Sequence, residues 1–494
     1  MSKGMQNVAD AAVTRISQSV TAPGPANGSG GGTGVPAGGP AVPGGAGPAE
    51  AGTAASGTVP DGARAGARAG DTAAPAGSEP AESGTGAREE KAPETRQESA
   101  PGIRQDSDPE ARQQSDPGTP RVLIAADKFK GSLTAVQVAE RLTAGLRRVV
   151  PGLPVEPLPV ADGGDGTVAA AVAAGFERRE TQVTGPLGTR VTAAYALSGD
   201  TAVVEMAEAS GLQHLPPGTF APLTATTHGA GELLRAALDA GARTIVFGVG
   251  GSATTDGGAG MLTALGARFL TADGSPVAPG GGPLGTLATA DLTGLDARLA
   301  GTDVILASDV DNPLTGPKGA AAVYGPQKGA SGEDVAVLDA SLAHFAEVLA
   351  TALGPRAGEI AAAPGAGAAG GIGYGALVGL GARFRPGIEV MLDVLGFAPA
   401  LGRATLVITG EGSLDEQTLH GKAPAGVAAA ARAAGKDVVA VCGRLALGAD
   451  ALAEAGIGRA YALTDVEPDV GRCMAEAGPL LELLGERIAG DLLT

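Results

Sequence analysis

The first 120 residues of this 494-residue chain lack leucine, phenylalanine, tyrosine and tryptophan altogether. A segment without such side chains buries too little apolar area to offset the entropy of ordering its backbone. Residues 20–119 also have the Ala/Gly/Pro/Ser composition of a linker. We therefore predict a disordered tail over residues 1–119, with at most a frayed helix at 7–20. The rest of the chain is long enough for one large domain or two lobes.

Cysteine is nearly absent, since only Cys442 and Cys473 are present. This excludes a disulfide framework and a zinc site built from four thiolates. The sequence has no apolar run of the ~18 residues that a membrane span needs, and no apolar block of a signal peptide at its start. The net charge is -18, and both the tail and the remainder are acidic. We therefore expect a cytoplasmic protein with small-molecule partners, no nucleic acid and no membrane.

From Arg121 onward the sequence pattern changes to short apolar runs that end in Asp or Gly, and each run is followed by a helical pattern. Within the first pattern, Val138, Leu142, Leu146 and Val149 fall on one face of a helix. Alternating strands and helices predict an α/β fold with a largely parallel sheet. The predicted strands are 122–126, 155–161, 244–249, 303–307, 404–408 and 437–441.

Residues 180–206 follow a different pattern, with polar and apolar residues alternating around a Gly-Pro turn. This predicts an antiparallel hairpin or meander that begins a second lobe. We expect a two-lobed α/β protein in which a Rossmann-like parallel-sheet lobe (120–180 and 382–494) receives a second α/β lobe as an insertion (181–381). The glycine-rich stretch 364–375 is expected to mark the return crossing.

Glycine and acidic residues recur where the predicted strands end, and ligands of an open parallel sheet bind at the carboxyl ends of its strands. Small residues let backbone N–H groups approach an anion, and carboxylates among them can hold a divalent cation. Lys130 and Lys422 would neutralise phosphate or carboxylate charge. Together these are the parts of a phosphoryl-transfer site. The segments are 127–132, 162–167, 250–258, 308–313 and 410–415 with 421–422.

Each segment alone also has a structural interpretation. A glycine turn can simply supply a positive φ, and Asp127 or Asp162 can cap the next helix. No P-loop motif is present, and no hydrolase-type Gly-x-Ser-x-Gly elbow follows these strands. His228 and His420 are interpreted as helix-start or loop groups rather than metal ligands. Cys442 is interpreted as a buried apolar side chain.

Taken together, the segments resemble the type-1 glycerate kinases. The resemblance runs in order from about residue 121 to 494 and excludes the tail. It implies transfer of the ATP γ-phosphoryl group to a hydroxyl of D-glycerate, with Mg²⁺, in a cleft between two α/β lobes. The chain departs from the commonest family pattern at Ala126, Lys128, Asp165 and Ser413. The segments that carry the resemblance are 122–135, 161–167, 250–261, 309–314, 324–330 and 410–418.

The chemistry of each side chain then predicts its role, given the resemblance to this family. Asp162 is the predicted base for the substrate hydroxyl, with Asp127 as the alternative, and Lys130 is the third predicted catalytic residue. Asp256 and Asp309 are the predicted Mg²⁺ ligands. A non-catalytic sensor of a small hydroxy acid is the alternative function, although it would have no use for these carboxylates. The predicted substrate- and phosphate-binding residues are Gly131, Ser132, Gly250, Gly251, Ser252, Glu411, Asp415 and Lys422.

Overall fold

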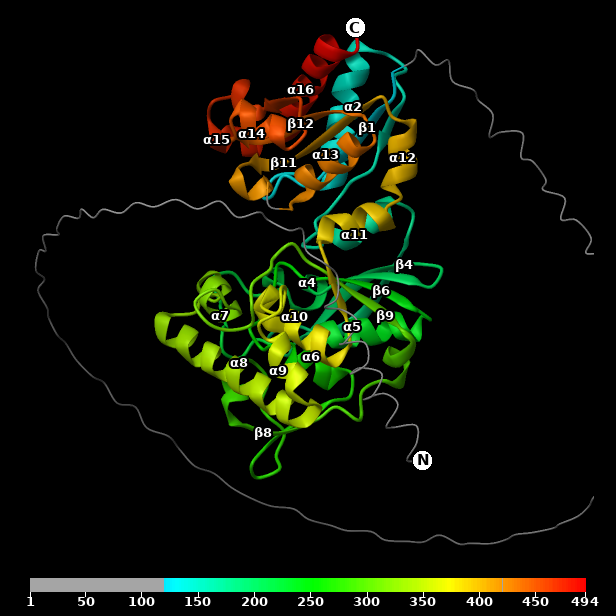
Figure 1. The fold of residues 1–494 in the computed structure, drawn as a ribbon. Coiled ribbons are helices and arrows are strands. Elements are labelled where there is room, and N and C mark those ends of the chain that lie inside the picture. The colour runs from blue at the N-terminus through cyan, green and yellow to red at the C-terminus, as the bar shows by residue number, and fades with distance from the viewer. Residues whose placement is uncertain (1–119, 420) are drawn as a thin grey trace, which may run out of the picture. The chain divides into compact units, whose positions relative to one another are not determined.

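The structure, a computed structural model, describes residues 120–419 and 421–494. The predicted tail at 1–119, its helix at 7–20 and His420 lie outside these residues. Within them, the chain forms two larger sheets and one small two-stranded sheet (Figure 1). The α-helices are α2 (Ala135–Val149), α3 (Thr167–Ala173), α4 (Ala207–Ser210), α5 (His228–Asp239), α6 (Ala259–Ala264), α7 (Ala320–Tyr324), α8 (Gly332–Leu353), α9 (Pro355–Ile360), α10 (Ala368–Gly379), α11 (Gly387–Val394), α12 (Phe397–Arg403), α13 (Ala423–Ala433), α14 (Ala449–Glu454), α15 (Val470–Ala475) and α16 (Ala477–Leu492).

The first sheet is entirely parallel and has the strand order β13-β12-β11-β1-β2. By position in the chain this is the order 2-1-3-4-5, one of the common doubly wound arrangements. The chain direction across the sheet therefore reverses between β1 and β11. The strands are β1 (Val122–Ala126), β2 (Val155–Pro157), β11 (Leu406–Leu414), β12 (Asp437–Leu445) and β13 (Arg459–Ala462).

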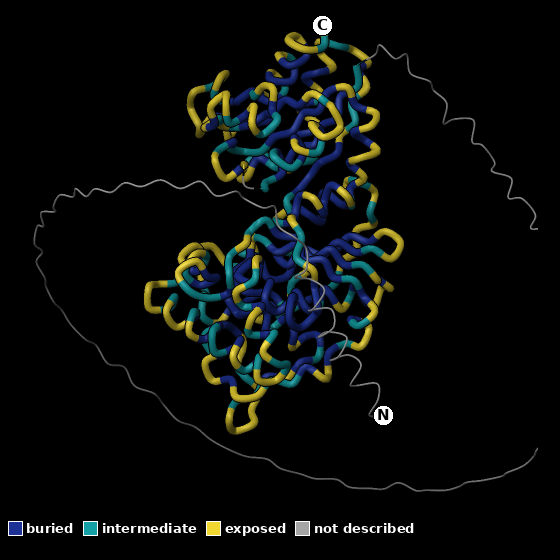
Figure 2. The backbone as a smooth tube through the Cα atoms, in the orientation of Figure 1, coloured by how far each residue is buried: buried dark blue, intermediate teal, exposed yellow. Residues whose placement is uncertain are grey.

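Strand β1 shows why this sheet needs helices on both faces, because all five of its residues are buried. Leu123 and Ala125 belong to an apolar cluster with α11, α12 and α13. Val122, Ile124 and Ala126 belong to another with α2 and α16. A continuous apolar run is what a central parallel strand, covered on both sides, requires. Figure 2 shows such buried segments in dark blue.

Helix α2 follows the predicted amphipathic pattern. Thr134 and Gln137 form a capping box at its start, and Val138, Leu142 and Leu146 are buried. Val149, expected on the same face, is 38% exposed because it is the last residue of the helix.

The second sheet has the order β10-β9-β6-β5-β4-β3 and is mixed. β3, β4 and β5 form the predicted antiparallel meander, and β5, β6, β9 and β10 run parallel. The predicted α/β class with parallel sheets is therefore confirmed. The division at residues 181 and 381 remains a proposal. The strands are β3 (Glu177–Thr184), β4 (Arg190–Ser198), β5 (Thr201–Glu205), β6 (Thr244–Gly248), β9 (Asp303–Ala307) and β10 (Arg383–Arg385), with β7 (Arg268–Thr271) and β8 (Leu287–Asp291) forming the small sheet.

The glycine-rich stretch does not form a crossing between lobes. Most of it is buried in and before α10, and a kink there places Ala369, Gly370 and Gly371 at positive φ. A Cβ atom at Gly370 would lie 1.9 Å from the carbonyl oxygen of Thr254. The glycines are therefore needed for close backbone packing, which composition alone does not distinguish from a loop.

Candidate active site

The site lies where the chain direction reverses in the first sheet, at the carboxyl ends of β1 and β11. Asp127 follows β1 directly, and its amide donates to the carbonyl oxygen of Gly410 on β11 at 2.8 Å. Glu411 comes next on β11. A doubly wound sheet opens a crevice at this point because the flanking connections leave in opposite directions.

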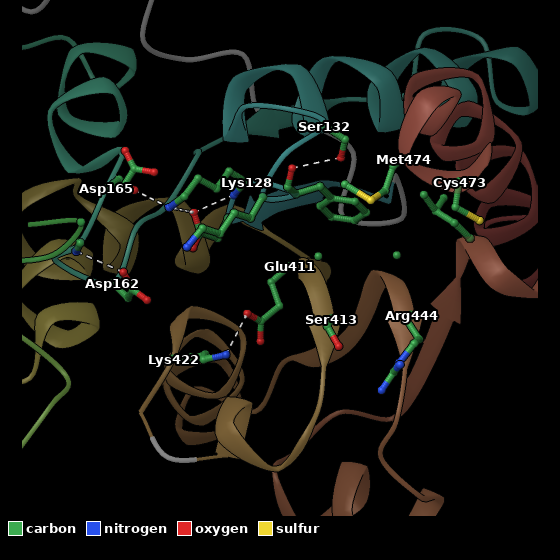
Figure 3. Close-up of a pocket in the computed structure, with 18 of the residues that line it drawn as sticks. Lys128, Ser132, Asp162, Asp165, Glu411, Ser413, Lys422, Arg444, Cys473 and Met474 are labelled. Atoms are coloured by element: carbon green, nitrogen blue, oxygen red, sulfur yellow. Dashed lines mark hydrogen bonds and ion pairs between the residues drawn. The ribbon is translucent and has the colours of Figure 1, made fainter. Parts of the chain in front are cut away.

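A cavity of about 710 Å³ occupies this position (Figure 3). It contains most of the predicted catalytic and binding residues, drawn from four of the five predicted segments. The lining residues are Asp127, Lys128, Phe129, Lys130, Ser132, Asp162, Gly164, Asp165, Leu212, Gln213, Gly250, Gly251, Glu411, Gly412, Ser413, Lys422, Gly443, Arg444, Leu463, Thr464, Val470, Cys473 and Met474.

Carboxylates crowd one end of the cavity, where Asp127, Asp162 and Glu411 are lining residues and Asp309 lies outside the lining. Burial raises the pKa of Asp127 to about 7, opposed by the Lys128 charge and reinforced by Asp162. The pKa of Asp309 is also raised to about 7, by burial and again by Asp162. Burial raises the pKa of Glu411 despite its hydrogen bond from Thr418. The negative charge of Asp162 thus raises the pKa of the three other carboxyls. A bound cation would reduce this repulsion between carboxylates.

Lysine side chains lie among these acids. Lys128 Nζ is 3.7 Å from Asp127 Oδ1 and donates to the carbonyl oxygen of Asp165. Burial alone would lower the pKa of Lys128, but the surrounding carboxylates raise it, so it stays charged. Lys422 Nζ is 3.7 Å from Glu411 Oε2, and Lys130 is exposed at the cavity wall.

Gly250 and Gly251 form the wall of the cavity beside the Asp162–Asp165 turn. A Cβ at Gly250 would lie 2.7 Å from the Cα of Gly164, and Gly251 has a φ of +63°. The backbone therefore passes close to the Asp162–Asp165 turn, and the predicted role of these glycines as an anion cradle remains a prediction. Ser252 does not join them in the cavity lining, because it is buried and accepts a hydrogen bond from Lys328.

The surroundings of Asp256 contradict its predicted role as a metal ligand. It is 1% exposed, outside the cavity lining, and its oxygens accept from the Thr227 amide and hydroxyl and from the amides of Gly258 and Gly260. Asp256 therefore ties together the starts of α5 and α6. Burial raises its pKa, and these hydrogen bonds lower it in part. Both carboxylate oxygens accept hydrogen bonds from the protein, which does not fit the predicted role of a Mg²⁺ ligand.

Asp415 and Gly131 also lie outside the lining. Asp415 Oδ1 accepts from the Gln417 amide at the start of a short 3-10 turn (Glu416–Leu419), so it shapes a turn rather than the cavity wall. Gly131 has a φ of +84° and turns the chain between Lys130 and Ser132. The hydroxyl of Ser132, which does line the cavity, donates to the Phe129 carbonyl at 3.0 Å.

The Glu411 segment differs from the predicted loop. Strand β11 continues to Leu414, so Glu411 and Ser413 pair in register with Cys442 and Arg444 of β12. Cys442 is fully buried, as interpreted from the sequence, and burial raises its thiol pKa to about 12.

Three charged groups near the cavity are not predicted by the sequence patterns. One is Lys128, which the patterns mark only as a departure from the family. Buried Lys328 and buried Glu205, whose carboxylate accepts from the amides of Gly166 and Val168, were not assigned at all. Burial raises the pKa of Glu205 to about 8. The sequence does contain an indication of a buried charge at Glu205, because this acidic residue directly follows the apolar residues Val203 and Val204.

The donors present fit a magnesium ion. Asp309 Oδ1 accepts from the Gly387 amide at 2.7 Å, the Ile388 amide also lowers the pKa of this carboxyl, and no hydrogen bond of standard geometry reaches its buried Oδ2. Such an orphaned oxygen beside a second carboxylate suits a hard cation. Within residues 120–419 and 421–494, no three acidic, His or Cys side chains converge as a ready metal site. Magnesium usually keeps water and substrate oxygens, so one or two carboxylates suffice.

A parallel sheet with a cavity of acids, lysines and glycine backbone at its reversal point defines an α/β enzyme of the small-molecule kinase type. The glycerate kinase family model matches residues 122–493. The chain belongs to the glycerate kinase family and is an enzyme, a phosphotransferase with an alcohol group as acceptor.

Several relatives match along nearly their whole length. Glycerate kinases of Halalkalibacterium halodurans and Bacillus subtilis are 46% and 45% identical over 74% and 75% of this chain, and 97% of each relative is covered. The Escherichia coli glycerate 2-kinase is 46% identical over 66% of this chain and 85% of its own. A crystal structure described as glycerate kinase 2 of Salmonella typhimurium is 42% identical, with a TM-score of 0.66, over 76% of this chain and 98% of that one.

Proposed function

We propose that this enzyme transfers the γ-phosphoryl group of ATP to D-glycerate with Mg²⁺ as the cofactor. The observation that carries the proposal is the single cavity that unites Asp127, Asp162, Lys130 and Lys422 with the Gly250–Gly251 backbone. Charge-neutralising lysines, free amides and a carboxylate base are what transfer between two anionic substrates requires.

We assign Asp162 as the group that accepts the proton of the attacking hydroxyl. It is half-buried in the cavity, and the Gly164 amide holds its Oδ1 at 3.1 Å, which fixes the carboxylate without enclosing it. Asp127 remains the alternative base, because its pKa of about 7 is suited to proton transfer at neutral pH. Lys128 contributes by holding Asp127 and the Asp165 backbone together.

Asp309, whose buried Oδ2 receives no hydrogen bond of standard geometry, would hold the magnesium ion, which leaves Asp162 free to act as the base. When bound, magnesium neutralises phosphate charge and orients the phosphoryl oxygens. The chain's own cations, Lys130 and Lys422, and the amides at Gly250 and Gly251 bind the phosphate or carboxylate oxygens. Glu411 keeps Lys422 in place at the cavity wall.

The 2-hydroxyl is the proposed acceptor, on the support of the Escherichia coli relative's description as glycerate 2-kinase. Phosphorus NMR of the product from ATP, Mg²⁺ and D-glycerate separates 2-phosphoglycerate from 3-phosphoglycerate. ATP consumption without either product would refute the proposed acceptor.

A non-catalytic sensor of hydroxy acids is the less favoured function, since a sensor gains nothing from crowding carboxylates whose pKa values are raised to about 7. Binding of D-glycerate without phosphoryl transfer would support it.

We also propose that the enzyme works in the cytoplasm. Among the described residues, only α8 is long and apolar enough to cross a membrane, which is a weak indication by length and composition alone. Its Leu338, Leu342, Phe345 and Leu349 are packed into the apolar core of the second sheet.

A further inference from the structure

The active-site cavity has a second end with a different chemical character. It is lined by Leu463 and Cys473, which are buried, and by Val470 and Met474, which are 52% and 50% exposed. Figure 3 shows Met474 and Cys473 on one side of the cavity and Asp162 and Asp165 on the other. Val470 and Met474 are one turn apart on α15, so their side chains lie on the same helix face.

Exposed apolar side chains that line a cavity indicate a ligand with an apolar surface. Glycerate offers none, because each of its three carbons carries oxygen. A purine base has two apolar faces, and the cavity continues without interruption from Met474 to the lysines that would meet its phosphates. We propose that the adenine base of ATP binds against Val470, Met474 and Leu463. This assignment rests on the proposed use of ATP.

Gly412 and Gly443 also line the cavity and present no side chain to it. A Cβ at Gly443 would lie 2.6 Å from the carbonyl oxygen of Gly412, and a Cβ at Gly412 would lie 3.4 Å from the amide nitrogen of Lys130. The absence of side chains leaves room for a ribose to cross from the apolar end to the phosphate end. Gly443 and Gly412 lie on the adjacent strands β12 and β11.

Two contacts connect the apolar end to the phosphate-binding turn. A Cβ at Gly131 would lie 3.2 Å from Met474 Cε, so the methionine methyl group rests on the turn that carries Lys130. Arg444 lies at the same end and forms no ion pair with any residue that the structure describes. An unpaired guanidinium beside an apolar surface suits a ligand that has both a base and an anionic chain.

The test compares ADP with inorganic triphosphate, which has the anionic charge but no base. Calorimetry should show that Met474→Asn, which removes the apolar surface without adding charge, weakens ADP binding by about tenfold or more, equivalent to ~1.4 kcal/mol, and leaves triphosphate binding and the KM for glycerate nearly unchanged. Met474→Leu should bind ADP like the wild type. Leu483→Asn is the matched control, because Leu483 is 45% exposed on α16 outside the cavity.

The outcomes separate this assignment from the proposed function. If the wild type binds ADP but Met474→Asn and Val470→Asn do not weaken it, or if they weaken ADP and triphosphate equally, the adenine assignment is wrong while ATP use stands. If the wild type binds neither ADP nor ATP, the proposed use of ATP fails together with it. Both side chains are half-exposed, so unchanged thermal melting is expected and excludes misfolding as the cause.

Discussion

The ammonium group of Lys328 donates to the hydroxyl of Ser252 at 2.7 Å and to the carbonyl oxygen of Thr254, directly behind the Gly250–Gly251 wall of the cavity. Lys328 is 2% exposed, and burial lowers its pKa to about 7, an effect that the charge of Asp256 partly opposes. Burying a lysine without hydrogen-bond partners costs free energy, so its two hydrogen bonds to Ser252 and Thr254 favour one conformation of the loop that contains them. Lys328 is thus a positioning residue for the phosphate-binding wall.

Lys328→Met should leave Ser252 and Thr254 without their donor. We expect a loss of stability of about 1–3 kcal/mol and a rise in the KM for ATP or glycerate. Lys318→Met, at an exposed lysine of the same lobe, is the control and should change neither. Steady-state kinetics with thermal melting test this, and an unchanged KM would show that the wall does not depend on Lys328.

Asp162→Asn keeps the shape of the side chain but removes the proton acceptor. If Asp162 is the base, kcat should fall by about 10²–10⁴ while folding is intact. The pH profile distinguishes Asp127. If Asp127 is the base instead, Asp162→Asn keeps most of its turnover, and Asp127→Asn abolishes the rise of kcat around pH 7 that the Asp127 pKa of about 7 predicts.

Asp309 should make the ligand-free enzyme less stable as the pH rises. Its pKa is raised from 3.8 to about 7 in the folded protein, so its stabilising effect as a neutral acid is fully present below about pH 4 and is lost as the pH rises to about 7. Asp309→Asn should therefore melt a few degrees higher than the wild type at about pH 8 and the same at about pH 4. Added Mg²⁺ should stabilise the wild type more than the variant at the higher pH.

Thermal melts at both pH values without ligand provide that measurement. A variant that melts lower at high pH would show that the Asp309 carboxylate is stabilising and would remove the argument for cation binding there. The kinetic counterpart is an increased Mg²⁺ requirement, because an amide oxygen is a poorer ligand for a hard dication.

Removal of residues 1–119 should leave folding and most turnover intact. The reason is compositional, because the segment has no leucine or aromatic residue with which to add buried apolar area. Melting and kinetics of a chain starting at Pro120 test this. A lost cooperative transition would contradict it.

Local patterns predicted the elements whose surroundings are simple. The all-apolar run at 122–126 predicts a central strand, and the spacing of Val138, Leu142 and Leu146 predicts α2. The strand predicted at 155–161 is shorter, because Pro157 and Pro159 have no N–H. The chain nevertheless stays extended beside β1, with the Leu158 and Val160 amides donating to its carbonyls.

Site residues were harder to assign because the same residue type serves both catalysis and packing. Asp256 follows a glycine-rich turn just as Asp162 precedes one, yet it is buried under the amides of two helices. Only the tertiary contacts distinguish a catalytic aspartate from one that stabilises the packing of two helices. Lys328 shows the reverse case, since nothing in its local sequence reports that its side chain points inward.

Strand β1 also fixes where the described chain begins relative to the active site. Arg121 pairs with Thr405 at the amino end of the strand, whereas Asp127 lies beyond its carboxyl end. A strand thus separates the junction at residue 120 from the catalytic cavity. A label, an affinity matrix or a fused protein joined at that point would be attached at the amino ends of the strands, away from the cavity at their carboxyl ends. The immobilised enzyme should therefore bind its substrates as well as it does in solution.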